Sequence, residues 1–197
     1  MTFADVTVLV PAAGSGARLG LGPKALIELN GRLVVEWVVR KSMQLAGEVI
    51  VACPPGAQVI LAGDCRWTRI EGGPTRQHSV RLLAHAATTD WVIVWDAARP
   101  FTSVELAHAV LAAAEQTGAA AAVLPDGSFQ TPLAFHRDLL LHTADLAHDE
   151  GWIATTTMAL VLRAGHAVAA VEGDPLNIKI TIDADWAQAS TLLDRLA

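Results

Sequence analysis

Four short stretches of this 197-residue chain place glycines, cations or a carboxylate soon after apolar segments. They are Pro11–Lys24, Gly72–Ser79, Asp96–Arg99 and Asn177–Lys179. Glycine lets backbone amides approach phosphate oxygens closely, and Arg and Lys bind the same oxygens through charge. A carboxylate beside phosphates can help to hold Mg²⁺. These residue types therefore indicate a phosphate-binding site.

The first stretch is a loop that carries two cations, Arg18 and Lys24, among the glycines Gly14, Gly16, Gly20 and Gly22. It lacks the GxxxxGK[ST] pattern of a Walker A loop. It also differs from the dinucleotide fingerprint G-x-G-x-x-G. The end of GSGARLG does not match that pattern, and no acidic residue stands at the end of the next predicted strand. Taken alone, the loop is also compatible with an ordinary turn between a strand and a helix.

The third stretch begins with Asp96, which directly follows the apolar run WVIVW. A carboxylate at a strand end can hold Mg²⁺ with few protein ligands when phosphates supply the others. The alternative is a turn-forming aspartate with Arg99 facing a helix. Both interpretations stay open on these residues alone.

Alternating apolar runs and helix-patterned stretches predict the elements that position these residues. Predicted strands are Val6–Val10, Glu48–Cys53, Trp67–Glu71, Trp91–Trp95 and Gly118–Leu124, with further apolar runs at Met158–Leu162 and Ala167–Glu172. Predicted helices are Leu33–Gln44, Gln77–Ala87, Ser103–Gln116 with Ser103 as N-cap, Phe135–His148 and Asp183–Leu196. Repeated β-α-β units predict a doubly wound, mainly parallel α/β sheet with right-handed crossovers. No linker or repeat interrupts the chain, so we expect one domain over residues 1–197.

The chemically interesting stretches all follow strands. In open α/β sheets, ligands bind beyond the carboxyl ends of the strands, where the strand order reverses. This shared placement argues for one site more strongly than any single motif does.

Composition excludes several classes of protein. The net charge of −6 argues against a protein that coats nucleic acid. No apolar stretch is long enough to suggest a membrane span, and the N-terminus lacks the basic region of a signal peptide. Cys53 and Cys65 form no CxxC pair, and the histidines show no metal-ligand spacing, so we expect a reduced, cytoplasmic setting.

Five motifs in order carry a family resemblance: PAAGSGARL…GPKAL, EGGPTRQHSV, DAARP, QTP and NIKIT. The chain resembles the 2-C-methyl-D-erythritol 4-phosphate cytidylyltransferases of the non-mevalonate isoprenoid pathway. The resemblance implies a Rossmann-like domain that uses CTP and Mg²⁺. It also implies transfer of CMP to the phosphate of a sugar-alcohol phosphate, with release of pyrophosphate.

The resemblance implies roles for individual residues. Catalytic positions that would grip the triphosphate are Arg18, Lys24 and Lys179. Nucleotide-binding positions are Pro11, Ala12, Ala13, Gly14, Ser15, Gly16, Gly72, Gly73, Arg76, Ser79 and Asp96, and Asp96 is also the expected metal ligand. Acceptor-binding positions are Arg99, Thr131 and Thr155. We expect Lys24→Ala to lower the rate roughly 10²–10³-fold, as loss of a transition-state contact does elsewhere.

The chain departs from the family pattern mainly on the acceptor side. Pro125–Phe129 stands where the family has a long arm that swaps between subunits, so we expect a monomer or a dimer built through another surface. Thr155-Thr156-Thr157 replaces a threonine–aspartate–glutamate segment. Leu133 replaces a glutamine, and Trp95 replaces a histidine.

Three functions remain open at this point. The first is a cytidylyltransferase acting on 2-C-methyl-D-erythritol 4-phosphate. The second is a cytidylyltransferase with another small phosphate or phosphonate acceptor, and the third is a catalytically weak nucleotide-binding protein. The expected partners are CTP and a small phosphorylated acceptor, with no nucleic acid and no membrane.

Overall fold

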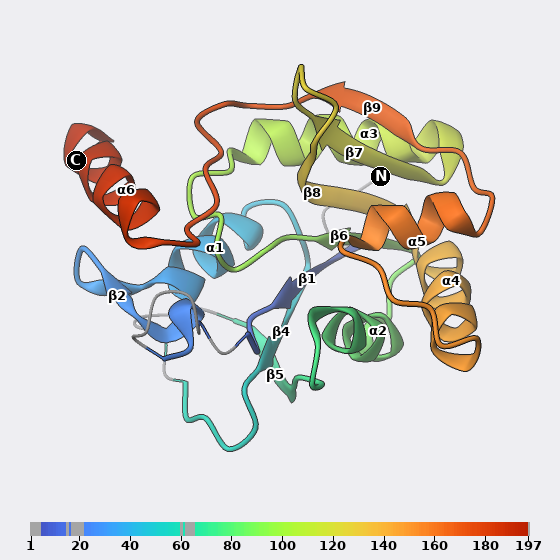
Figure 1. Ribbon diagram of the computed structural model, residues 1–197, viewed down its shortest axis with the longest axis horizontal. Helices are drawn as coiled ribbons and strands as arrows, with labels where there is room; N and C mark the ends of the chain where they lie inside the picture. The colour runs from blue at the N-terminus through green and yellow to red at the C-terminus, as the bar shows by residue number, and fades with distance from the viewer. Residues whose placement is uncertain (1–4, 15, 17–21, 60, 62–65, 197) are drawn as a thin grey trace.

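The computed structural model describes residues 5–14, 16, 22–59, 61 and 66–196, and its centre is a seven-stranded sheet (Figure 1). The strand order is β5–β4–β1–β6–β8–β7–β9. The strands are β1 (Val6–Pro11), β4 (Glu48–Cys53), β5 (Thr68–Glu71), β6 (Trp91–Val94), β7 (Ala119–Val123), β8 (Phe129–His136) and β9 (Ala169–Glu172). β8 runs antiparallel to both of its neighbours, and the other pairs are parallel. The predicted mainly parallel α/β sheet is confirmed.

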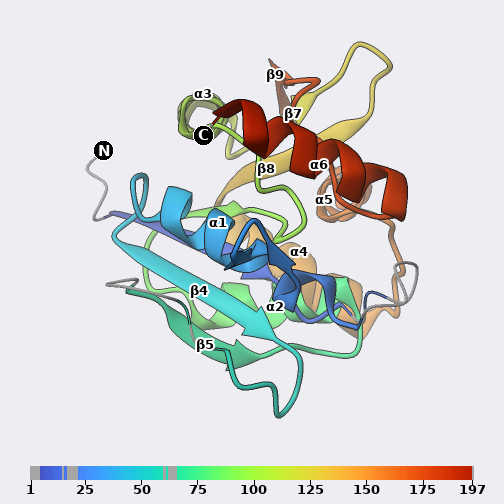
Figure 2. The same ribbon diagram turned by 90° about the vertical axis from the view of Figure 1, so that its left-hand side faces the viewer.

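Helices cover both faces of the sheet (Figures 1 and 2). They are α1 (Val34–Ser42), α2 (Arg76–Ala86), α3 (Val104–Thr117), α4 (Arg137–Asp149), α5 (Thr157–Arg163) and α6 (Asp183–Leu196). α1 and α3 share one core with the sheet, while α2, α4 and α5 share the core on the opposite face. A short hairpin, β2 (Glu28–Leu29) and β3 (Arg32–Leu33), lies outside the main sheet.

Strand β1 lies in the middle of both cores. Val6, Val8 and Val10 belong to the core that contains α1 and α3, whereas Leu9 belongs to the core that contains α2. Successive side chains of a strand point to opposite faces, so a strand covered on both sides must be apolar throughout. This is why VTVLV is a nearly continuous apolar run.

Capping residues set the ends of α2 and α3. The Ser103 side chain accepts a hydrogen bond from the Leu106 amide at 3.1 Å, as predicted for the N-cap of α3. Gly118 ends α3 with φ of 84°, a left-handed conformation that glycine adopts without a steric penalty. Thr75 caps α2 in the same way as Ser103 caps α3, accepting from the His78 amide.

The predicted helix Phe135–His148 is wrong at its start. Residues 129–136 form β8 between β6 and β7, and α4 begins at Arg137. Pro132 follows a cis peptide bond after Thr131, and the pairing of β8 with β7 shifts register at this point. Because proline has no N–H to donate, it fits a central strand only where the ladder is interrupted.

The apolar run Met158–Leu162 is helical, because it lies within α5. The C-terminal helix α6 is as predicted, and it packs against the β2–β3 hairpin and the start of α1 in a third core cluster. None of the described helices combines the length and apolarity that a bilayer crossing requires.

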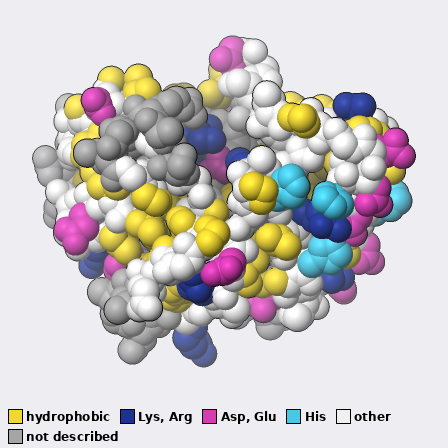
Figure 3. Space-filling model, turned by 60° about the horizontal axis from the view of Figure 1, so that its bottom comes forward, with side chains coloured by type: hydrophobic (Ala, Val, Ile, Leu, Met, Phe, Trp, Pro, Cys, Tyr) yellow, Lys and Arg dark blue, Asp and Glu magenta, His cyan; other side chains and the backbone are white. Residues whose placement is uncertain are grey.

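A polar contact links α2 and α4 at the surface. Asp145 Oδ1 accepts from Arg81 Nε at 2.6 Å and lies 2.9 Å from His85 Nε2. Histidine, cationic and acidic side chains gather on this part of the molecule (Figure 3). The contact holds two helices of the same face together.

Candidate active site

A cleft of about 650 Å³ opens beyond the carboxyl ends of β1, β5 and β6. From β1 the chain continues to β4 and β5 on one side and returns to β6 on the other side of β1. This reversal of strand order is where open α/β sheets bind ligands. Predicted residues that line the cleft are Pro11, Ala12, Ala13, Gly14, Gly72, Gly73, Arg76, Ser79, Asp96 and Lys179.

Two of the loops approach each other closely at Gly72. A Cβ at this position would lie 2.2 Å from Ala13 Cβ, and 3.3 Å from the Cys53 carbonyl oxygen that accepts from the Gly72 amide. Real Cβ atoms essentially never come as close as 2.2 Å to another carbon. Glycine is therefore required here by the contact between the loops after β1 and β5.

The side chain of Ser79 stabilises the turn from Gly73 into α2 through two hydrogen bonds to the backbone. Ser79 Oγ accepts from the Gly73 amide at 3.2 Å and donates to the Thr75 carbonyl at 3.0 Å. Ser79 is 1% exposed. Its hydroxyl thus shapes the loop, and the loop in turn sets the wall of the cleft.

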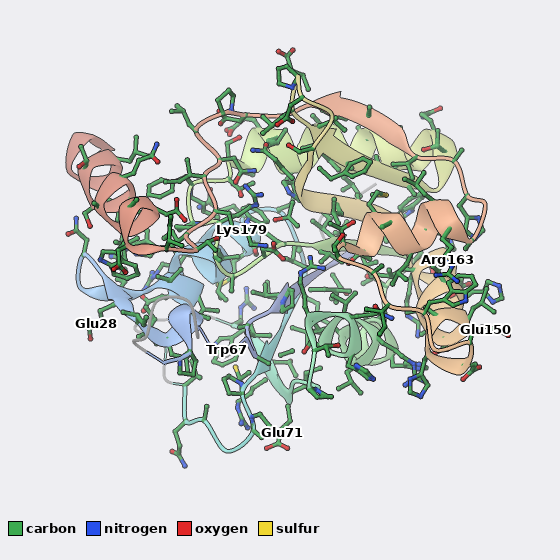
Figure 4. The ribbon with its side chains drawn as sticks, viewed as in Figure 1. Glu28, Trp67, Glu71, Glu150, Arg163 and Lys179 are labelled. Atoms are coloured by element: carbon green, nitrogen blue, oxygen red, sulfur yellow. The ribbon has the colours of Figure 1, made fainter. Side chains whose placement is uncertain are left out.

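Asp96 is the centre of the charged part of the cleft. Its Oδ1 accepts from Arg76 Nε at 2.9 Å and from Arg76 Nη2 at 2.8 Å, while its Oδ2 accepts from Lys179 Nζ at 2.8 Å. Arg76 comes from the start of α2. Lys179 comes from the segment between β9 and α6 (Figure 4). One buried carboxylate therefore brings together two cations from distant parts of the chain.

The surroundings of Asp96 determine its charge. Burial raises the pKa of the carboxyl group, but Arg76 and Lys179 outweigh burial and hold that pKa well below its usual range. Asp96 is therefore ionised at neutral pH and pairs with both cations.

Asn177 positions the segment that carries Lys179. Its side chain is fully buried, with Nδ2 donating to the Thr131 carbonyl at 2.8 Å and Oδ1 accepting from Thr102 Oγ1 at 2.7 Å. The Asn177 carbonyl accepts from Arg99 Nη1. Three segments of the chain thus meet at this one side chain.

Lys41 of α1 also supports the loop after Asp96. Its Nζ donates to the carbonyls of Pro100 at 2.8 Å and Thr102 at 3.1 Å. Burial lowers the pKa of the Lys41 ammonium, and the charge of Glu105 opposes that shift. No local sequence pattern indicates the supporting role of Lys41. Asn177 stands in one of the stretches singled out above, but its supporting role depends on contacts with distant parts of the chain.

The predicted acceptor-side residues lie around the cleft rather than on its wall. Thr131 is 5% exposed, and its Oγ1 accepts from the Asp96 amide at 3.2 Å. Arg99 contacts Asn177, as described above, and burial lowers its pKa. Thr155 lines a small neighbouring cavity behind Arg76. Their roles in acceptor binding stay predictions.

The remaining predicted positions belong to the loop after β1. Ser15 and Arg18 lie outside the described residues, and so does the side chain of Lys24, which begins the 3-10 helix η2 (Lys24–Leu26). Gly16 has φ of 66°, in the left-handed region. Its place in nucleotide binding also stays a prediction.

The Thr155–Thr157 segment replaces expected carboxylates with hydroxyls that have partners. Thr156 caps α5, because its Oγ1 accepts from the Ala159 amide at 3.1 Å. Thr157 Oγ1 accepts from Arg76 Nη1 at 2.9 Å. Thr157 was not among the predicted site residues, although the unusual run of three threonines pointed to its neighbourhood.

The described residues do not by themselves fit a magnesium site. No group of three or more His, Cys, Asp or Glu residues in this part of the chain could hold a metal ion, and both Asp96 oxygens accept from cations. Magnesium prefers near-octahedral oxygen ligands. Direct ligation by Asp96 would require Arg76 or Lys179 to move away, so the predicted metal role of Asp96 stays a prediction.

Comparison with protein families gives a match over nearly all of the chain. The family model described as 2-C-methyl-D-erythritol 4-phosphate cytidylyltransferase matches residues 6–126 and 127–195.

Several relatives that carry this name are more than a third identical to the chain. An enzyme of Thermus thermophilus is 39% identical over 209 residues, which cover 95% of this chain and 97% of that protein. The enzyme of Deinococcus radiodurans is 38% identical, with coverage of 93% and 88%. A crystal structure of the enzyme from Thermus thermophilus superposes with a TM-score of 0.86 at 35% identity, and covers 98% of this chain and 100% of that one.

Proposed function

Because the chain belongs to the 2-C-methyl-D-erythritol 4-phosphate cytidylyltransferase family, we propose that it transfers the cytidylyl group of CTP to the phosphate of 2-C-methyl-D-erythritol 4-phosphate. The single observation that supports this most directly is the cleft itself. Glycine-rich loops and two cations held by Asp96 meet there, at the edge of the sheet where nucleotides bind.

The proposed reaction is an in-line displacement at phosphorus. An oxygen of the acceptor phosphate forms a bond to the α-phosphorus of CTP, and the bond from that phosphorus to the oxygen bridging the β-phosphate breaks. The electron pair leaves with pyrophosphate. An acceptor phosphate is already anionic near neutral pH, so the reaction needs positioning and charge stabilisation rather than a strong base.

The residues of the cleft supply that stabilisation. Lys179 and Arg76 face the space in which the phosphates would lie, and Asp96 fixes the position of both cations. We assign Arg18 and Lys24 to the same task, on the family resemblance of their loop. Arg76 and Lys179 are held by Asp96 before the substrate arrives, which is the condition for effective electrostatic catalysis.

We further propose that activity requires Mg²⁺, bound mainly through oxygens of the triphosphate. When bound, the ion would neutralise phosphate charge as the pyrophosphate leaves. Loss of turnover on chelation with EDTA, restored by added MgCl₂, would support this. Because CTP is an intracellular nucleotide, we also propose a cytoplasmic location.

A different acceptor is not favoured, because the relatives named above are all described as acting on the same polyol phosphate. The departures on the acceptor side also have structural explanations. Thr156 caps α5, and Thr157 contacts Arg76. These hydroxyls keep the local structure without the carboxylates.

The test is pyrophosphate release from CTP, with 2-C-methyl-D-erythritol 4-phosphate compared against other small phosphates and phosphonates. We expect turnover with this acceptor and with CTP in preference to ATP, GTP or UTP. Turnover only with a different acceptor, or nucleotide binding without any turnover, would contradict the proposal.

The variant Lys179→Ala tests whether the charge of Lys179 contributes to catalysis. Its loss of charge should lower kcat/KM by roughly 10²–10³, the cost of removing one transition-state contact in other enzymes. Lys179→Arg retains the charge and should lose less. Equal activity of wild type and Lys179→Ala would remove Lys179 from the mechanism.

A further inference from the structure

The guanidinium of Arg76 is held from two sides. Nε and Nη2 donate to Asp96 Oδ1, while Nη1 donates to Thr157 Oγ1 at 2.9 Å. Asp96 alone would leave the guanidinium free to turn about its contact with one oxygen atom. The second contact fixes its plane, and with it the part of Arg76 that faces the cleft.

Thr157 sits on a well-anchored element. It is 4% exposed and begins α5, whose Met158 and Val161 belong to the core shared with α2. The preceding Thr156 caps the same helix. The hydroxyl of Thr157 therefore has a defined position.

The neighbour of Arg76 makes a second link to the same segment. Gln77 Nε2 donates to the Trp152 carbonyl at 2.8 Å, and Gln77 Oε1 accepts from the Ala154 amide at 3.2 Å. Arg76 thus binds the first residue of α5, and Gln77 binds the segment just before it. This link ties the start of α2 to α5 without a charged partner.

The hydrogen bond from Arg76 to Thr157 adds no negative charge beside Arg76, because the acceptor is a neutral hydroxyl. Arg76 and Lys179 share one carboxylate, so the trio of Arg76, Asp96 and Lys179 has one positive charge in excess. A carboxylate at position 157 would cancel that excess positive charge. A hydroxyl orients Arg76 and leaves the excess charge unchanged. Near a protein surface, such a charge acts more strongly on an anionic ligand than it would in bulk water.

We propose that Thr157 is a positioning residue for Arg76, whose neutral hydrogen bond fixes the guanidinium while preserving the positive charge that the cleft offers to the triphosphate of CTP. This inference rests on the proposed function for the identity of the nucleotide. It assigns to Thr157 a role in nucleotide affinity that acts through Arg76.

The first test compares Thr157→Val with Thr157→Ser and with Thr143→Val. Valine keeps the shape of threonine and removes the hydroxyl, while serine keeps the hydroxyl. Thr143 is the matched control: it lines the same small cavity, is 1% exposed, and its hydroxyl has no hydrogen-bond partner in the described part of the chain.

We expect Thr157→Val to lower kcat/KM for CTP about tenfold, chiefly by raising KM for CTP, because a hydrogen bond to a charged group is lost. KM for the acceptor should not change. Thr157→Ser and Thr143→Val should stay within about twofold of wild type. An unchanged Thr157→Val, an equal loss in Thr143→Val or a failure of serine to rescue would each overturn the proposal.

A second pair of variants tests the charge. Thr157→Glu and Thr157→Gln have nearly the same size, but only glutamate adds a negative charge beside Arg76. We expect KM for CTP to be several-fold higher with glutamate than with glutamine, roughly the effect of a close ion pair in a partly buried site. Equal KM values would refute the role of the excess charge.

Failure of the proposed function is distinguishable from failure of this inference. Absence of turnover in the wild-type protein would contradict the function alone. The same variants would then be compared by calorimetric titration with CTP and by crystallography of Thr157→Val. Arg76 found in an unchanged position in that crystal structure would overturn the positioning role, and a displaced guanidinium would support it.

Discussion

At the scale of single residues, Asp96 organises the charged part of the cleft, because its carboxylate pairs with two cations. Its pKa lies below its usual range, so the folded state favours the ionised form more than the unfolded state does. The resulting stabilisation is present above the unfolded pKa of about 4 and is lost as the pH falls through the folded pKa.

Asp96→Asn tests this linkage. The variant should be less stable than wild type at neutral pH, because Arg76 and Lys179 lose their charged partner. The difference in unfolding free energy should shrink as the pH is lowered below about 4. Urea denaturation of both proteins across the acid range measures it, and a difference that does not vary with pH would contradict the linkage.

Gly72→Ala tests the close approach of two loops. The added methyl group would collide with Ala13 Cβ, so one of the loops must move, and we expect a loss of about 1–3 kcal/mol in unfolding free energy. Turnover should fall as well, since both loops line the cleft. Gly14→Ala is the control for stability, because a Cβ at Gly14 would meet no described atom within 4 Å. Equal stability of the two variants would be the contradicting result.

At the scale of elements, the segment between β9 and α6 depends on Asn177. Asn177→Ala should lower the unfolding free energy by about 1–3 kcal/mol, because the Thr131 carbonyl loses a buried partner. It should also lower turnover, because Lys179 lies only two residues further along the chain.

Asp145→Ala serves as the control for this variant. It removes the surface contact between α2 and α4, and partly exposed ion pairs contribute less than about 1 kcal/mol. Its kcat should match that of wild type. Denaturation and steady-state kinetics on both variants separate the two effects, and an Asn177→Ala protein with normal turnover would contradict the supporting role.

The elements that the sequence predicts well are those with strong local signals. β1 is a continuous apolar run, and α3 has Ser103 at its start and Gly118 at its end. β8 was missed for a physical reason. It contains Pro132 and is covered on both faces, so it shows neither the usual composition of a central strand nor an alternation of polar and apolar residues.

In the candidate site, too, the residues with local sequence signals could be predicted and the others could not. Asp96 and Lys179 could be predicted because each stands in a motif after an apolar segment. The contact of Arg76 with Thr157 joins residues 81 positions apart, and that of Asn177 with Thr131 joins residues 46 positions apart. Hydrogen bonds over such separations are decided by tertiary packing, and no local pattern encodes them.

At the scale of the whole molecule, the connection between β7 and β8 bears on assembly. It is a tight turn in which the Leu124 amide donates to the Ser128 carbonyl at 3.0 Å and the Gly127 amide donates to the Leu124 carbonyl at 2.8 Å. We expect so short a turn to exchange nothing with a second copy. We therefore expect a monomer, or a dimer formed through another surface.

Light scattering coupled to size-exclusion chromatography measures this directly. A monomer has a mass of 20.7 kDa. A dimer whose crystal structure showed residues 124–128 exchanged between subunits would contradict the prediction.

The long separations within the charged trio also bear on how the protein is made. Asp96 and Lys179 are 83 positions apart, and Lys179 stands near the C-terminal end of the chain. Contacts of this kind form only after long loops close, and during synthesis chains fold from the N-terminal side. A nascent chain can pair β1, β4, β5 and β6 before the segment that carries Lys179 has been made. We therefore expect the cleft to stay incomplete until the segment that carries Lys179 has been synthesised.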